Sequence, residues 1–415
     1  MFIDMFGSIW GTLAVNILII VGSLLTAIAA KYHSFGLMVA GRVIFGIGSG
    51  LIVTMQESLL SKWFRTQHLS LAIGMQLSIS RLSSFLGTLV ANPIAKSTGD
   101  WVWPFWLSLF FCAFSILMNV VYAGVVKHLR GQATLTKAER KALKQKKTFH
   151  WKSLFKFPHI FWLIICIEFI YAAVWSTFQV IATELVKLHF GTTSVLAGFK
   201  ASAAHVVPIV ATPLLGIIMD TFGFRVVILW LSAIFLILST GLLGWTHVDA
   251  VVGMVLYSFS LAFGPIAMIT AIGMVLPSDY IGTGLGIYKS SNNIGTTILD
   301  IVAGIIQDGT KNEGYVNVML LFIILSGIGF VLIVVLWIVQ RIKYNNLLEC
   351  KRSIRTERMK EINGKELELT RQGLDAYHST PVNKFNYLYV GTFVSSLIVA
   401  WVLFFVYAAA SGGGE

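Results

Sequence analysis

The sequence predicts an all-α protein, a polytopic bundle of transmembrane helices. Of its 415 residues, 56% are hydrophobic and 12% are charged, whereas a soluble domain carries about 25% charged residues. The mean hydropathy is +0.79. Apolar runs of about 20 residues, the length needed to cross a bilayer, recur along almost the whole chain. The composition is therefore that of an integral membrane protein, and the lipid bilayer is its first expected partner.

Each long apolar run is expected to form a membrane-spanning helix, and about eleven such helices are expected in all. The alternative for the last run is a helix that lies against the membrane, but its length and lack of charge favour a span. The expected spans cover residues 9–30, 37–60, 69–91, 104–126, 160–185, 194–219, 226–245, 251–276, 282–306, 316–339 and 387–410.

The spacing of these runs predicts two helical halves with polar segments between and after them. The first half has four spans and the second has six, and one further span follows the second polar segment. The expected divisions are residues 1–126 for the N-terminal half, 127–157 for a basic linker, 158–341 for the C-terminal half, 342–384 for a polar segment and 385–410 for the extra span.

The placement of basic residues predicts how the bundle is oriented. Lys and Arg are concentrated in the linker at 127–157 and in the polar segment at 342–384, and alternation of the spans puts both on one side. The loops on the other side hold few basic residues. Because cytosolic loops are enriched in Lys and Arg, both segments are expected in the cytosol, where their charge also suits the lipid surface.

Several classes of function lack their signatures in this sequence. The basic segments carry no aromatic or helix-borne base readers, so no nucleic-acid partner is expected. The three cysteines show no metal-ligand or disulfide spacing. No pairing of a nucleophile with a base appears either. We therefore expect no enzyme, no cofactor and no metal site.

One short loop between two expected spans carries a specific pattern. Its residues are Gly216, Asp220, Gly223 and Arg225, in the order G-x-x-x-D-x-x-G-x-R. Glycine permits a tight turn and close helix approach, while the acid can accept hydrogen bonds at a helix N-terminus. This loop resembles the signature loop of the major facilitator superfamily, a family of solute carriers.

Two further motifs support this resemblance. Asp4 and Gly7 repeat the D-x-x-G core before the first span, and Arg42 with Gly46 opens an R-x-x-x-G-x-G pattern in the second span. Members of the superfamily have twelve helices, built as two related halves, and their first signature loop lies between the second and third. The resemblance therefore implies that this chain lacks the family's first two helices and is N-terminally incomplete.

A narrower resemblance follows from Gly41-Arg42, Lys62-Trp63-Phe64 and the Ser78–Leu82 stretch around Arg81. These residues look like the group called major facilitator superfamily domain-containing protein 1, which comprises lysosomal dipeptide-type carriers. The resemblance implies a lysosomal or vacuolar membrane, with the plasma membrane as the alternative. The sequence leaves open an accessory membrane subunit as a further partner.

Ionisable and polar residues inside the spans are the best pointers to a transport path, because each is costly in a bilayer unless it is paired or hydrated. Arg81 lies near the middle of its span, and its forked, permanently charged guanidinium suits a carboxylate. That carboxylate is expected to belong either to a bound solute or to a protein side chain such as Glu57, Glu168 or Asp300. Other polar side chains recur at helical spacing on the spans at 160–185 and 282–306. The candidate substrate-binding residues are Arg81, Glu57, Glu168, Tyr171, Trp175, Lys289, Asn293 and Asp300.

The polar residues within the spans predict a facilitative or secondary-active transporter of small polar, carboxylate-bearing solutes. The resemblance implies that the small-molecule partner is a dipeptide or an amino-acid-like compound. The two halves of the transporter are expected to rock about a site near the midplane. The alternative is a transport-inactive membrane sensor or partner subunit derived from a carrier. The residues with expected structural roles in the motifs are Asp4, Gly7, Arg42, Gly46, Gly216, Asp220, Gly223 and Arg225.

Overall fold

The structure is a computed structural model, and it describes residues 8–64, 68–132, 151–310, 314–371, 377 and 383–412. Over these residues every regular element is helical, so the predicted fold class is confirmed. The long helices are α2 (Ser8–Lys31), α3 (Phe35–Trp63), α4 (Leu69–Thr98), α5 (Trp103–Gln132), α7 (His159–Phe190), α8 (Ser194–Ser202), α9 (Val206–Phe222), α10 (Arg225–Trp245), α11 (Ala250–Val275), α12 (Ile281–Asp308), α13 (Val316–Lys343), α14 (Arg352–Arg371) and α15 (Lys384–Gly412). Three short 3₁₀ helices are η1 (Trp151–Lys156), η2 (Ala203–His205) and η4 (Leu347–Glu349).

The expected membrane spans coincide with these helices. In the described residues, 10 helical segments are long and apolar enough to cross a membrane, and α8, η2 and α9 together form one of them. The expected span that is not among them is α12, which is nevertheless a helix of 28 residues. Its polar side chains, among them Lys289, Asn293 and Asp300, lower its hydropathy, as is typical of a helix that lines an interior and does not face lipid.

Local sequence explains where several helices begin and end. Asp249 caps α11 by accepting a hydrogen bond from the amide of Val251 at 3.0 Å, and Thr193 caps α8 through the amide of Leu196 at 3.4 Å. Gly191 ends α7 in the left-handed conformation, with φ +63°, which glycine adopts without a steric cost.

The chain divides into two compact units, and the smaller comprises residues 1–59 and 91–150. In this unit α2 packs closely on α3, since a Cβ added at Gly22 would lie 2.4 Å from the Phe45 amide nitrogen. Thr12 Oγ1 donates to Asn119 Oδ1 at 3.4 Å, which links α2 to α5. The packing of α2, α3 and α5 leaves a cavity of about 270 Å³ between them.

The larger unit comprises residues 60–90 and 151–415. It contains the end of α3, residues 69–90 of α4, and α7 to α15. Helix α4 lies against α9, because a Cβ at Gly74 would lie 2.4 Å from the Thr212 carbonyl oxygen and one at Gly216 would lie 2.5 Å from that of Ser70. The Thr212 hydroxyl also donates to the Gly74 carbonyl at 2.9 Å. Small residues thus allow α4 and α9 to approach backbone to backbone.

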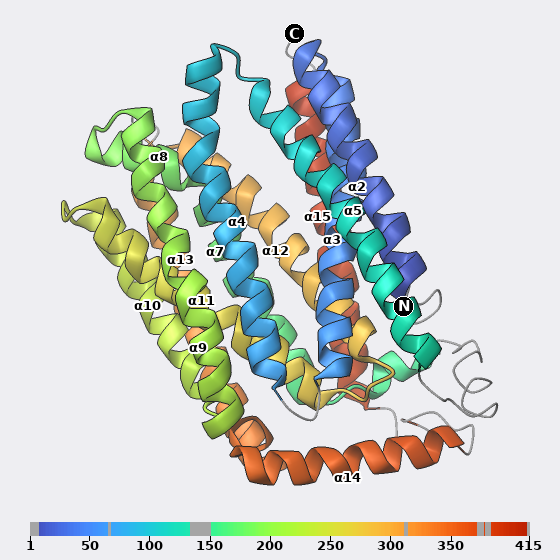
Figure 1. Ribbon diagram of the computed structural model, residues 1–415. Coiled ribbons are helices and arrows are strands. Elements are labelled where there is room, and N and C mark those ends of the chain that lie inside the picture. The colour runs from blue at the N-terminus through green and yellow to red at the C-terminus, as the bar shows by residue number, and fades with distance from the viewer. Residues whose placement is uncertain are drawn as a thin grey trace. The chain divides into compact units, whose positions relative to one another are not determined.

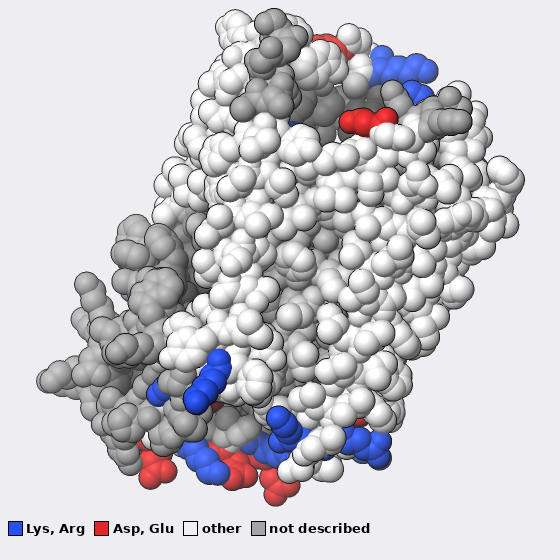
Figure 2. Space-filling view, turned by 180° about the vertical axis from the view of Figure 1, so that it is seen from behind, with Lys and Arg blue, Asp and Glu red and all other residues white. Residues whose placement is uncertain are grey.

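Helix α14 differs from the other long helices in this unit. It carries many charges, and in Figure 1 it lies across one end of the unit, transverse to the spanning helices. The Glu366 carboxylate fastens it to the turn before α12 by accepting from the Ser278 hydroxyl at 2.9 Å. On the face shown in Figure 2, Lys, Arg, Asp and Glu side chains gather at the helix ends, as expected for a bundle that crosses a bilayer.

Candidate functional site

A cavity of about 360 Å³ lies inside the larger unit. Four helices contribute to its walls, namely α4, α7, α11 and α12, so it sits among the spanning helices and not at their ends. Its lining is unusually polar for the interior of an apolar bundle. The side chains that give it this character are Arg81, Glu168, Trp175, Gln179, Tyr288, Lys289 and Asn292.

Arg81 reaches this cavity from α4. It is the thirteenth residue of that helix, roughly 18 Å from the helix start at a rise of about 1.5 Å per residue. The ion pairs of the described residues do not include Arg81, although the acid Glu168 lines the same cavity. Because arginine stays protonated, this site presents a permanent positive charge to whatever fills the cavity.

Charges of both signs face the cavity from α7 and α12. Glu168 Oε1 accepts a hydrogen bond from Asn292 Nδ2 at 3.2 Å, which fixes one oxygen of this nearly buried carboxylate. The Lys289 ammonium lies 5.5 Å from the centre of the Tyr288 ring, within the range of a cation–π contact. The cavity therefore offers two cations and one anion at its surface.

The aromatic wall of the cavity is held rigidly. Trp175 Nε1 donates to Ser260 Oγ at 3.0 Å, and the Tyr257 hydroxyl donates to the Trp175 carbonyl at 2.6 Å. A Cβ added at Gly264 would lie 2.1 Å from the Trp175 ring, so only glycine leaves room for the indole. Gln179 Nε2 donates to the Tyr257 hydroxyl at 3.1 Å.

The structure brings together half of the candidate substrate-binding residues. Arg81, Glu168, Trp175 and Lys289 line the same cavity. Asn292 also lines it and was missed, although it lies three residues after Lys289, which is helical spacing for a shared face. The neighbouring residue Asn293 had been expected instead, and it does not line the cavity.

The remaining candidates lie elsewhere. Tyr171 is buried and donates its hydroxyl hydrogen to the Ser326 carbonyl at 2.9 Å, which is a packing role between α7 and α13. Asp300 accepts from the Thr177 hydroxyl at 2.5 Å. Glu57 is buried in the smaller unit. A role for these three residues in solute binding stays a prediction.

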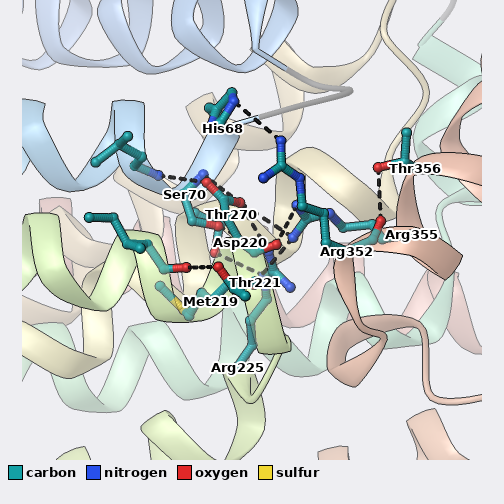
Figure 3. Close-up of polar contacts among 12 residues, drawn as sticks. His68, Ser70, Met219, Asp220, Thr221, Arg225, Thr270, Arg352, Arg355 and Thr356 are labelled. Atoms are coloured by element: carbon teal, nitrogen blue, oxygen red, sulfur yellow. Dashed lines mark hydrogen bonds and ion pairs between the residues drawn. The ribbon is translucent and has the colours of Figure 1, made fainter.

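The signature loop forms a second polar site at one end of the larger unit, shown in Figure 3. Asp220, near the end of α9, accepts hydrogen bonds from the backbone amides of Ser70 at 3.2 Å and Leu71 at 3.0 Å. These amides belong to the first turn of α4, where amides have no partner within the helix and carry partial positive charge. Asp220 therefore joins α9 to the start of α4.

Arg225 occupies the same site from the start of α10. It is 1% exposed, and its Nη2 donates to Ser70 Oγ at 2.9 Å while lying 3.9 Å from Asp220 Oδ1. Its Nε donates to Thr270 Oγ1 at 3.3 Å and its Nη1 donates to the Leu348 carbonyl at 3.3 Å. The guanidinium thus ties α10 to α4, α11 and η4.

A second arginine, which the loop motif alone could not reveal, comes from α14. Arg355 Nη1 lies 3.3 Å from Asp220 Oδ1, and its guanidinium donates to the carbonyls of Met219 at 3.2 Å and Asp220 at 3.0 Å. Burial lowers the pKa of Arg355, and the Asp220 carboxylate acts in the opposite direction. Asp220 is therefore shared between two buried arginines.

The structural roles expected of the other motif residues are seen at some positions and not at others. Gly223 has φ +92° and lies where a Cβ would be 2.6 Å from the Glu349 carbonyl oxygen, so the turn needs glycine. Gly46 has no described atom within 4 Å of its Cβ position, and close packing there is not seen. Arg42 lies over the Phe105 ring, 5.8 Å from its centre. Asp4 and Gly7 lie outside the described residues.

Comparison with known proteins identifies the family. The sequence profile of the Major Facilitator Superfamily matches residues 1–183 and 164–413. This chain belongs to that superfamily. It is a multi-pass membrane protein with the superfamily's helical fold. The family is one of membrane transporters, as the sequence motifs predicted.

The similar proteins with curated names agree with the narrower resemblance. The human protein named lysosomal dipeptide transporter MFSD1 is 26% identical over 82% of this chain and 74% of its own length. Its zebrafish (Danio rerio) counterpart is 28% identical over the same shares. Both relatives support the predicted resemblance to this group of carriers.

Solved structures confirm the fold. The human organic anion transporter MFSD10 (TETRAN) has a TM-score of 0.59 at 16% identity, covering 80% of this chain and 78% of that one. The proton:xylose symporter XylE has a TM-score of 0.65 at 15% identity, covering 81% and 80%. At these identities the likeness concerns the fold alone.

Proposed function

We propose that this protein moves small carboxylate-bearing solutes of the dipeptide or amino-acid type across an endomembrane, by alternating access to the cavity in the larger unit. The observation that carries the proposal is Arg81, an intramembrane guanidinium that lines a polar cavity and takes no part in the ion pairs of the described residues. A buried charge in a bilayer needs a counter-ion or water. The carboxylate of a bound solute would be the counter-ion of Arg81.

The other polar groups of the cavity suit the rest of such a solute. Glu168 offers an anion to a free amino group, and Lys289 adds a second cation for a carboxylate or a polar side chain. The flat faces of Trp175 and Tyr288 give apolar contact for a side chain or peptide unit. A zwitterionic solute would satisfy both signs of charge at once, which favours a dipeptide over a simple anion.

The named activity of the MFSD1 proteins supports a dipeptide substrate and a lysosomal membrane for this chain. A dipeptide also fits the volume of about 360 Å³, which lies at the lower end of the usual range for small-molecule sites, about 300–1,000 Å³. We assign the lysosomal or vacuolar membrane on this basis.

Glu168→Gln tests the assignment of the amino-group partner. Removal of one charge-assisted hydrogen bond, worth about 1.5–3 kcal/mol, is expected to weaken binding of dipeptides with a free amino group at least tenfold. Binding of the N-acetylated dipeptide, which has no ammonium group, should change little. The measurement is ligand-induced thermal stabilisation of the purified protein with each of the two dipeptides.

Glu184→Gln is the matched control, because it removes another carboxylate from α7 without touching the cavity wall; Glu184 accepts a hydrogen bond from the Tyr315 hydroxyl at 2.7 Å. This variant should keep the preference for a free amino group. Equal weakening of both dipeptides by Glu168→Gln would show that Glu168 supports the fold of the cavity and does not bind the ammonium.

A further inference from the structure

A groove of about 720 Å³ lies between the end of α9 and the first turns of α14. Thr221 and Phe222 contribute the α9 wall, and residues 351–360 contribute the other wall. Figure 3 shows Thr221 beside Asp220 of the signature-loop site, and the Arg352 guanidinium directed toward His68, with Nη2 3.5 Å from His68 Nε2. The groove is separate from the intramembrane cavity, with which it shares no lining residue.

The groove collects positive charge that the described residues do not neutralise. Lys351, Arg352 and Lys360 line it, against the single acid Glu357. Neither lysine has a carboxylate within ion-pair distance in the described part of the chain. In contrast, Lys365 on the same helix lies 2.7 Å from Glu361. Three cations around one groove repel one another, so an anion bound between them would be stabilised.

The start of α14 adds amide donors at the same place. This helix of 20 residues begins at Arg352, so the amides of its first turn have no acceptor within the helix. The first described bond of this kind is from the Arg355 amide to the Lys351 carbonyl at 2.9 Å. The Ser353 hydroxyl lines the groove and makes no hydrogen bond to another described residue. Free amides, a hydroxyl and lysines together match the acceptors of a phosphate group.

Exposed apolar side chains place the groove at the edge of the membrane-facing surface. Phe222 in the groove is 49% exposed, and Ile218, one turn earlier on α9, is 41% exposed. Val227 and Leu231 on α10 are also exposed. The apolar surface of α9 and α10 thus ends where the cationic groove begins, which is the depth of lipid headgroups.

We propose that this groove binds a phosphomonoester, carried either by the headgroup of an anionic lipid or by a soluble inositol phosphate. Helix α14 connects this groove to the signature loop. Arg355 lies three residues after Arg352 on α14 and holds Asp220. An anion that neutralises Lys351, Arg352 and Lys360 would therefore hold α14 against the ends of α9 and α4.

The test uses the full chain in nanodiscs and measures the shift of its unfolding temperature. Three additions are compared: a phosphatidylinositol phosphate in the bilayer, soluble inositol hexakisphosphate with a phosphatidylcholine bilayer, and phosphatidylserine at the same total lipid charge. The variant is Lys351→Gln with Lys360→Gln. The matched control is Lys365→Gln with Lys384→Gln, which removes the same charge from exposed positions outside the groove.

We expect the groove variant to bind the phosphate ligand about 100-fold more weakly, about tenfold for each lysine–phosphate hydrogen bond that the substitutions remove, while the control stays within about twofold of the native protein. Stabilisation by the lipid alone identifies a headgroup as the ligand, and stabilisation by inositol hexakisphosphate identifies a soluble one. The proposal is overturned if neither phosphate ligand stabilises the protein, if phosphatidylserine stabilises it equally, or if the control variant is weakened as much as the groove variant.

Discussion

Arg81→Ala is expected to weaken binding of carboxylate solutes by about 100-fold. Truncating one partner of a desolvated charge pair costs about 2–5 kcal/mol, and about 2.7 kcal/mol corresponds to a factor of 100. No described carboxylate forms an ion pair with Arg81, and Glu168, the acid that lines the same cavity, keeps its hydrogen bond from Asn292 Nδ2 at 3.2 Å when Arg81 is removed. The unfolding temperature of the variant without solute should therefore stay close to that of the native protein.

The sharpest measurement of this effect compares a dipeptide with its C-terminal amide on both proteins. Native protein should prefer the carboxylate strongly, and Arg81→Ala should bind the two alike. Arg81→Lys should restore the charge and recover only part of the preference, because lysine lacks the forked donors. Arg42→Ala is the control, since this intramembrane arginine lies in the smaller unit over Phe105. Unchanged selectivity in Arg81→Ala would remove Arg81 from the binding site.

Asp220→Asn is expected to lower the free energy of unfolding by about 3–5 kcal/mol, the cost of leaving a buried charge without its partner. The substitution removes the anion shared by Arg225 and Arg355, which are 1% and 4% exposed. It also weakens the acceptor for the first turn of α4. The cavity is formed elsewhere on these helices, so solute affinity should change much less than stability.

Asp249→Asn provides the matched control for this prediction. Asp249 is 58% exposed in its pair with Lys200, exposed pairs contribute little to stability, and asparagine can still cap α11. Adding Arg355→Gln to Asp220→Asn should recover part of the stability, because one of the two stranded cations is gone. The measurement is thermal unfolding of the native protein, of Asp220→Asn, of Asp249→Asn and of the double variant. A decrease in Asp220→Asn no larger than in Asp249→Asn would show that the two arginines do not depend on Asp220.

The sequence predicted the spanning helices well because hydropathy reports directly on the solvent that surrounds them. It did not predict α14, which lacks an apolar run. Tertiary contacts hold that helix in place: Met359 is fully buried, Arg355 binds the end of α9, and Glu366 binds the turn between α11 and α12. A helix stabilised by docking leaves only a weak signal in its own sequence.

The sequence predicted some of the residues that line the cavity and not others. Helical spacing placed Glu168 and Trp175 on one face of α7, and both line the cavity. Tyr171 shares that spacing, yet it packs where a Cβ at Gly329 would lie 2.4 Å from its ring. The neighbouring helices decide which residues along a helical face reach a cavity. The spacing of residues within one helix does not reveal which helices pack beside it.

Solute flux tests the central claim most directly. The native full chain, reconstituted into liposomes, should exchange a labelled dipeptide across the membrane in a saturable manner. Unlabelled dipeptide should compete, whereas its C-terminal amide should compete poorly, because the amide offers no anion to Arg81. Binding of the dipeptide without any exchange would contradict the account and would favour a solute sensor derived from a carrier.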